Sequence, residues 1–180
     1  MLRLTPELVY PAAALVCATI GAIYDVRSRR VPNVLTLPAI LFGLLLHFTL
    51  GGWRQLGSAL AAGLICGLIF LVLYAAGGMG AGDVKLITAI GCIAGLPRTG
   101  YLLVMTALAG GIMALALVLY RGRFKETLSN IGVLAVHHRY EGLAPHPELN
   151  IANAQALRLP YALAIATGTA LMFFVLVVQG

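Results

Sequence analysis

The sequence predicts an all-α, polytopic membrane protein that forms one membrane-embedded domain over residues 1–180. Two features of composition carry this prediction. Of the 180 residues, 61% are hydrophobic and only 10% are charged, and the mean hydropathy of +0.96 lies well above that of ordinary soluble domains. A third observation is that apolar runs recur along the whole length, so a cleavable signal peptide does not explain them.

Six segments are candidates for membrane-spanning helices, each of which needs roughly 20 apolar residues. They run near residues 7–24, 34–51, 56–76, 84–97, 100–120 and 159–178. The fourth is short and covers only about 20 Å before Pro97. We therefore expect it to start below the membrane surface, to thin the bilayer locally or to be shielded by its neighbours.

The basic residues predict the orientation, because cytoplasmic loops carry the excess of lysine and arginine. Alternate connections hold nine and three of them: Arg27, Arg29, Arg30, Lys85, Arg121, Arg123, Lys125, Arg139 and Arg158 on one side, and Arg3, Arg54 and Arg98 on the other. The first side is predicted to be cytoplasmic, with both termini outside, in a plasma (inner) membrane. This asymmetry accounts for the net charge of +6, so a nucleic-acid partner is an unnecessary inference.

The one long connection, residues 121–158, predicts an amphipathic cytoplasmic segment between the fifth and sixth spans. Apolar residues at helical spacing lie opposite polar ones: Phe124, Leu128, Ile131 and Leu134 against Lys125, Glu126, Ser129 and Asn130. A helix on the membrane surface and a packed cytoplasmic cap both fit this pattern.

The sequence predicts no metal site and no cofactor. His137, His138 and His146 have no acidic partner at a fixed interval, which is typical of solvated loop histidines. Cys17, Cys66 and Cys92 lie in apolar runs without CxxC spacing, so we interpret them as packing residues.

Asp25 and Asp83 are the acidic residues that require an explanation, because they lie where predicted spans meet the cytoplasmic surface. Ionised side chains within spans are costly and indicate function. Structural alternatives exist: Asp83 can cap the fourth helix, and Arg27, Arg29 and Arg30 can neutralise Asp25. Two adjacent carboxyls cannot both ionise readily, so as a pair they can activate water for attack on an amide, which is aspartic proteolysis.

The helix ends suggest which aspartate holds the proton. Asp25 lies near a helix C-terminus, where the dipole favours the protonated form, and Asp83 lies at a helix N-terminus, where it favours the ionised form.

Four glycines precede Asp83, in GGMGAGD: Gly77, Gly78, Gly80 and Gly82. They allow another chain to approach the backbone closely. We interpret them as a site where an unwound substrate strand pairs with the backbone; the alternative is a flexible hinge. Neither nucleotide-binding glycine motif is matched.

These motifs resemble a known family. Gly80-Ala81-Gly82-Asp83 followed by Lys85 is similar to the GxGD signature of membrane-embedded aspartyl proteases, and Asp25 followed by Val31-Pro32-Asn33 resembles the first-aspartate motif of type IV prepilin peptidases. Pro160-Tyr161-Ala162 resembles the closing motif of that family. The likeness spans about residues 10–175, and the short chain is most similar to the branch that processes Flp prepilins of tight-adherence systems.

The resemblance implies cleavage of the short, basic leader of a prepilin at the cytoplasmic face, with Asp25 and Asp83 as catalytic acids. The prepilin and the lipid bilayer are then the partners, together with assembly proteins of a pilus or secretion system. Larger relatives also methylate the new N-terminus with S-adenosylmethionine. The loop from Asp25 to Asn33 is too short for their added domain and lacks cysteine, so we expect no methylation.

Neighbouring residues receive positioning or substrate-binding roles. We expect Pro32 and Asn33 to fix the loop that holds Asp25, with Asn33 satisfying open backbone groups. Lys85 is predicted to bind headgroups, to bias the aspartate pair or simply to anchor its helix. Pro160 starts the last helix and Tyr161 suits the headgroup level; Gly80 and Gly82 complete the set.

Four other functions remain open. Tyr24-Asp25 with GxGD is also similar to presenilin and signal-peptide peptidase, although those have about nine spans and a Pro-Ala-Leu element that is absent here. An archaeal preflagellin peptidase is closer. A small cation- or proton-coupled transporter is disfavoured because both acids lie at one surface and no internal repeat is visible. A structural subunit of a secretion apparatus would make both aspartates dispensable.

Overall fold

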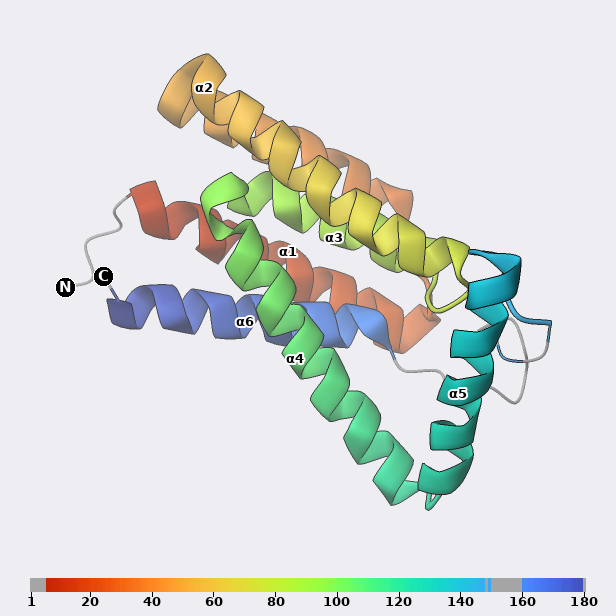
Figure 1. Ribbon diagram of the computed structural model, residues 1–180. Coiled ribbons are helices and arrows are strands. Elements are labelled where there is room, and N and C mark those ends of the chain that lie inside the picture. Colours follow the sequence, from red (N-terminus) through yellow and green to blue (C-terminus); the bar gives the residue numbers. More distant parts are fainter. Residues whose placement is uncertain (1–5, 148, 150–159, 180) are drawn as a thin grey trace.

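The computed structural model describes residues 6–147, 149 and 160–179. These residues form six helices: α1 (Pro6–Ser28), α2 (Asn33–Ala75), α3 (Ala81–Ala94), α4 (Leu96–Tyr120), α5 (Phe124–Glu141) and α6 (Tyr161–Gln179). The prediction of an all-α fold is confirmed. Figure 1 shows α1, α3, α6 and both arms of α2 running alongside one another, with α4 crossing them and α5 at one end.

Four of these helices are long and apolar enough to cross a membrane: α1 from Leu8, α2, α4 and α6. The 43 residues of α2 would extend about 65 Å if straight, roughly twice the thickness of a bilayer core. The helix is interrupted at Gly52, whose φ of 67° and ψ of −160° suit glycine. The chain reverses there (Figure 1), so the two arms of α2 correspond to the predicted segments 34–51 and 56–76.

The predicted span over residues 84–97 is corrected. Helix α3 has 14 residues and ends at Ala94, and it is too short to be among the four candidate spans. Gly95 ends it with a φ of 78°, and α4 then begins at Leu96 with Pro97 inside its first turn. Of the three expectations for this segment, shielding by neighbours fits best, because nearly all of α3 from Leu86 onward is buried.

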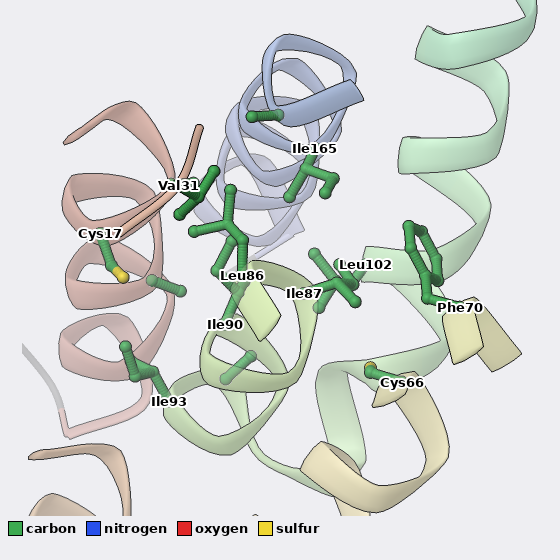
Figure 2. Packing of buried hydrophobic residues seen from close by; sticks show 14 of the residues in the cluster. Cys17, Val31, Cys66, Phe70, Leu86, Ile87, Ile90, Ile93, Leu102 and Ile165 are labelled. Carbon is green, nitrogen blue, oxygen red and sulfur yellow. The ribbon is translucent and has the colours of Figure 1, made fainter. Parts of the chain in front are cut away.

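The core of the bundle forms around α3. Figure 2 shows Leu86, Ile87, Ile90 and Ile93 among side chains from the other helices: Cys17 of α1, Cys66 and Phe70 of α2, Leu102 of α4 and Ile165 of α6. Cys17, Cys66 and Cys92 are buried free thiols, which confirms their interpretation as packing residues. The fold therefore surrounds its shortest helix with its longest ones.

A polar contact at the end of the bundle where α3 meets α4 helps to fix the break between these two helices. His47 of α2 is fully buried and stacks on Tyr10 of α1, with ring centroids 4.1 Å apart. Its Nε2 lies 3.0 Å from the carbonyl oxygen of Ile93. A Cβ at Gly95 would lie 2.6 Å from the His47 ring, so glycine is required there for the close approach as well as for its φ.

Glycine also allows α6 to cross α4 at close range. A Cβ built at Gly168 would overlap the backbone of Thr106, and both residues are buried. Such small-residue contacts are the usual means by which membrane helices approach each other. The crossing therefore packs the middle of α6 closely against α4.

We predict that Gly168→Ala destabilises the protein by about 1–3 kcal/mol, because the new methyl group meets backbone that cannot rotate away. Gly111→Ala is the matched control, since a Cβ at this site in α4 would meet no atom within 4 Å beyond the nearby backbone of its own helix. Thermal unfolding of the purified protein in detergent measures both. Equal midpoints for the two variants would contradict the close crossing.

Candidate active site

All the predicted site residues come together at one end of the bundle. Helix α1 ends there, α2 both begins and ends there, and α3 and α6 begin there (Figure 1). Two short connections, residues 29–32 and 76–80, join these helix ends. The residues gathered in this way are Asp25, Pro32, Asn33, Gly80, Gly82, Asp83, Lys85, Pro160 and Tyr161.

Asp83 occupies the third position of α3 and is only 8% exposed. The backbone N–H of Gly80 donates to its Oδ2 at 3.2 Å, and the N–H of Asp83 donates to the carbonyl oxygen of Gly80 at 3.1 Å. The side chain therefore closes the first turn of α3 from inside the helix, with Gly80 and not Asp83 as the N-cap residue, which corrects the capping alternative. Capping uses one carboxyl oxygen and leaves Oδ1 without a hydrogen bond to any described residue.

Asp25 lies in the last turn of α1 and is half-buried. Partial burial opposes its negative charge, whereas a hydrogen bond from the backbone N–H of Ala162 and the positive charge of Arg29 stabilise it. Ala162 lies in the first turn of α6, so the positive end of that helix points to a carboxylate at the negative end of α1.

Arg29 ends α1 in an unusual conformation. Its φ is 51°, and its N–H donates to the carbonyl oxygen of Asp25 at 2.7 Å. Holding a residue with a side chain in the left-handed region costs about 1–2 kcal/mol. The sequence identified Arg29 as one of three arginines near Asp25 but gave no signal for this conformation, nor for the amide of Ala162.

The two carboxyl groups interact electrostatically. Burial, followed by the negative charge of Asp25, raises the pKa of Asp83 to about 6, against an opposing contribution from the Gly80 N–H. Burial thus favours the proton on Asp83, whereas the helix dipoles alone favour it on Asp25. Desolvation outweighs the dipole because Asp83 lies deeper in the bundle than Asp25.

Tyr161 and Pro160 form the third side of the site. Tyr161 is half-buried against the core and lies within reach of the charge of Asp83. The carbonyl oxygen of Pro160 accepts the N–H of Leu163 at 3.0 Å, which starts α6 as the sequence predicted. The beginning of α6 thus faces both aspartates: the N–H of Ala162 bonds to Asp25, and Tyr161 lies close enough to feel the charge of Asp83.

Lys85 and Asn33 join α3 to α2. The Nζ of Lys85 donates to Oδ1 of Asn33 at 2.9 Å. Asn33 was expected to satisfy open backbone groups, but its side chain accepts a hydrogen bond from Lys85, and the N-cap of α2 is Pro32. The carbonyl oxygen of Pro32 accepts the N–H groups of Leu35 and Thr36 at 3.0 and 3.3 Å.

Three of the glycines before Asp83, Gly77, Gly78 and Gly82, have defined structural roles where α2 ends and α3 begins. Gly77 has a φ of 77° and donates to the carbonyl oxygen of Tyr74, and Gly78 donates to that of Leu73, both at 2.9 Å. This pair of hydrogen bonds is a Schellman motif that ends α2. At Gly82 a Cβ would lie 3.3 Å from the backbone nitrogen of Val31, so the start of α3 packs on the connection after Asp25.

The histidines of the long connection lie far from these carboxyls in the sequence and form a group of rings. The centroid of His137 lies 5.4 Å from that of His138 and 4.8 Å from that of His146. Among the described residues, no three or more His, Cys, Asp or Glu side chains are arranged so that they could hold a metal ion. Nothing in this part of the chain assigns a catalytic role to the histidines.

Comparison with known proteins links the chain to a peptidase family. The family model described as "Type IV leader peptidase family" matches residues 12–115, a range that includes both aspartates. The chain is 34% identical over 109 residues to a prepilin leader peptidase/N-methyltransferase of Aeromonas hydrophila, covering 57% of this chain and 37% of the relative. The protein of the same name from Neisseria gonorrhoeae is 33% identical over 107 residues, covering 55% and 37%. No solved structure matches the chain.

The raised pKa of Asp83 predicts how stability depends on pH. The ordinary pKa of 3.8 applies in the unfolded chain and a value of about 6 in the fold, so folding takes up a proton between them. The free energy of unfolding should therefore fall as the pH rises from 3.8 through about 6, by on the order of 3 kcal/mol.

Asp83→Asn should remove this fall in the free energy of unfolding with pH. The variant should be more stable than wild type at pH 7.5, because its amide oxygen still accepts the Gly80 N–H. Thermal unfolding in detergent across pH 4–8 measures the effect. Glu141→Gln, which removes an exposed carboxyl, is the control. An unchanged pH slope in Asp83→Asn would contradict the assignment.

Proposed function

Because this chain belongs to the type IV leader peptidase family, we propose that it is a membrane aspartic endopeptidase that removes the leader of a type IV prepilin. Asp25 and Asp83 are the catalytic acids. The feature that supports this most strongly is a buried carboxyl near a second one: burial, followed by the negative charge of Asp25, raises the pKa of Asp83. The matched segment covers only 37% of the relatives named above.

The chemistry follows from the unequal surroundings of the two acids. Ionised Asp25 takes a proton from water as the water oxygen attacks the carbonyl carbon of the scissile amide, and protonated Asp83 donates to the carbonyl oxygen. Collapse of the tetrahedral intermediate breaks the C–N bond. The departing nitrogen takes the proton held by Asp25, and the hydroxyl proton returns to Asp83, which restores the starting state.

The substrate must be extended at the cut, and the backbone before α3 is suited to pair with it. Gly78 is exposed and Gly80 is half-exposed next to Asp83. With no side chains at these two positions, an extended strand can approach the backbone. We assign Gly80 and Gly82, with Pro32, Asn33, Lys85, Pro160 and Tyr161, to positioning the substrate or the aspartates.

The finer identity is part of the proposal. The excess of basic residues at this end of the bundle supports a cytoplasmic active site with both termini outside. The substrate class that we propose is a small Flp-type prepilin with a short basic leader. An archaeal-type preflagellin peptidase would have the same pair of acids, and the choice of substrate separates the two.

The test of the proposed function is cleavage of an Flp-type prepilin by the purified protein in liposomes. We expect cleavage after the terminal glycine of the leader, and a loss of at least about 10²-fold in both Asp25→Asn and Asp83→Asn, because each variant removes one partner in proton transfer. Glu141→Gln should cleave like wild type.

Other outcomes identify other functions. Cleavage of a flagellin precursor but not of the prepilin would assign the archaeal-type activity. If neither precursor is cut by folded protein and Asp25→Asn abolishes cation or proton flux, the transporter alternative replaces the peptidase.

The contact between Lys85 and Asn33 predicts a positioning effect. Lys85→Met should lower kcat roughly fivefold while KM changes little, because the variant loses about 1 kcal/mol of the contact that holds α3 against α2. Asn33→Asp, which keeps an acceptor for Lys85, should retain activity. Arg54→Gln, in an exposed position at the opposite end of the bundle, is the control. A rise in KM alone would point to substrate binding by Lys85.

We further propose that this chain does not methylate the new N-terminus of the cleaved pilin, although the names of its relatives include N-methyltransferase. Only residues 29–32 connect α1 to α2, which leaves no room for an additional domain there. Incubation with cleaved prepilin and labelled S-adenosylmethionine should transfer no methyl group. Transfer that survives Asp83→Asn would overturn this proposal without affecting the peptidase.

A further inference from the structure

Helix α5 turns polar side chains toward the rest of the protein and apolar side chains away from it. Its half-buried positions are mostly polar: Thr127, Asn130, His137 and His138, with Leu134. Its large apolar side chains point outward, and Phe124, Leu128 and Ile131 are 50%, 61% and 57% exposed. No residue of α5 is buried. A packed cap would bury its apolar side chains and expose its polar ones. The exposed apolar face of α5 therefore requires an apolar environment outside the chain.

The position of α5 places this face beside a bilayer. Helix α4, a candidate span, ends at Tyr120. A turn of three residues, 121–123, follows, and α5 begins at Phe124. Since a residue spans at most about 3.6 Å, the start of α5 lies within about 15 Å of the end of that span. Figure 1 shows α5 running across the direction of α1 and α6, as a helix in the membrane plane would.

The charges around the apolar face favour an anionic lipid surface. At 100° per residue, Phe124, Leu128, Ile131 and Ala135 fall within one stripe about 60° wide. Lys125 and Arg139 flank one edge of this stripe and both are exposed. Tyr120 and Tyr140, which are 88% and 80% exposed, bracket the region as interfacial aromatics do.

We propose that α5 docks on the lipid headgroup region at the active-site end of the bundle. The stripe Phe124–Leu128–Ile131–Ala135 enters the boundary between headgroups and acyl chains, and Lys125 and Arg139 bind the phosphates of anionic lipids. This chooses the membrane-surface helix over the packed cap. The proposal depends on the membrane location of the chain and not on the peptidase activity.

The experiment uses the full chain in vesicles of phosphatidylcholine and phosphatidylglycerol, part of them brominated on the acyl chains. Trp53 is the single tryptophan, and Trp53→Phe provides a silent background. Leu128→Trp and Ile131→Trp report from the stripe, and Ser129→Trp is the matched exposed control about 100° away from Leu128. Circular dichroism and unfolding of each variant establish that it is folded.

Docking predicts that brominated lipid quenches Leu128→Trp and Ile131→Trp strongly, with emission shifted to shorter wavelength, and quenches Ser129→Trp weakly. Adding Lys125→Gln and Arg139→Gln should reduce the dependence of quenching on phosphatidylglycerol. Equal, weak quenching at long wavelength for all three would show a helix in water and overturn the proposal. Short-wavelength emission at the stripe without quenching would overturn it in favour of a protein partner, such as a second copy of the chain.

Discussion

The burial of one carboxyl group beside another is the constraint on which this structure depends. In an apolar bundle a carboxyl such as Asp83 is unfavourable unless its hydrogen bonds are satisfied or it keeps its proton. Helix α3 meets part of this demand by using Asp83 to close its own first turn through Gly80. The remaining cost appears as the raised pKa of Asp83. The same cost makes the group useful as an acid at moderate pH.

Asp25 is supported in a different way. A carboxylate near the end of α1 faces the negative end of a helix dipole, which alone would destabilise it. Two interactions offset this effect: the positive charge of Arg29, which adopts a left-handed conformation at the end of α1, and the N–H of Ala162 at the start of α6. The aspartate pair is therefore held by three helix ends, those of α1, α3 and α6.

The sequence predicted the features that depend on local pattern. Hydropathy identified the helices, and the motifs around Asp25 and Asp83 identified residues that the fold does bring together. It failed where tertiary position decides. The length of α3 and the start of α4 depend on Gly95, which must fit against His47. The helix dipoles favour the proton on Asp25, whereas the burial of Asp83, which the sequence does not show, raises the pKa of Asp83. The partner of Asn33 proved to be Lys85, 52 residues away.

A direct measurement of the pair is possible because Asp25 and Asp83 are the only two aspartates in the chain. Selective labelling of the aspartate carboxyl carbon should give two NMR signals that can be titrated in detergent or nanodiscs. We predict that the signal of Asp83 titrates near pH 6 in the wild-type protein and at clearly lower pH in Asp25→Asn, because the neighbouring charge is gone. A titration of Asp83 that is the same in both proteins would show that the carboxyls do not interact, and would contradict the paired-aspartate account.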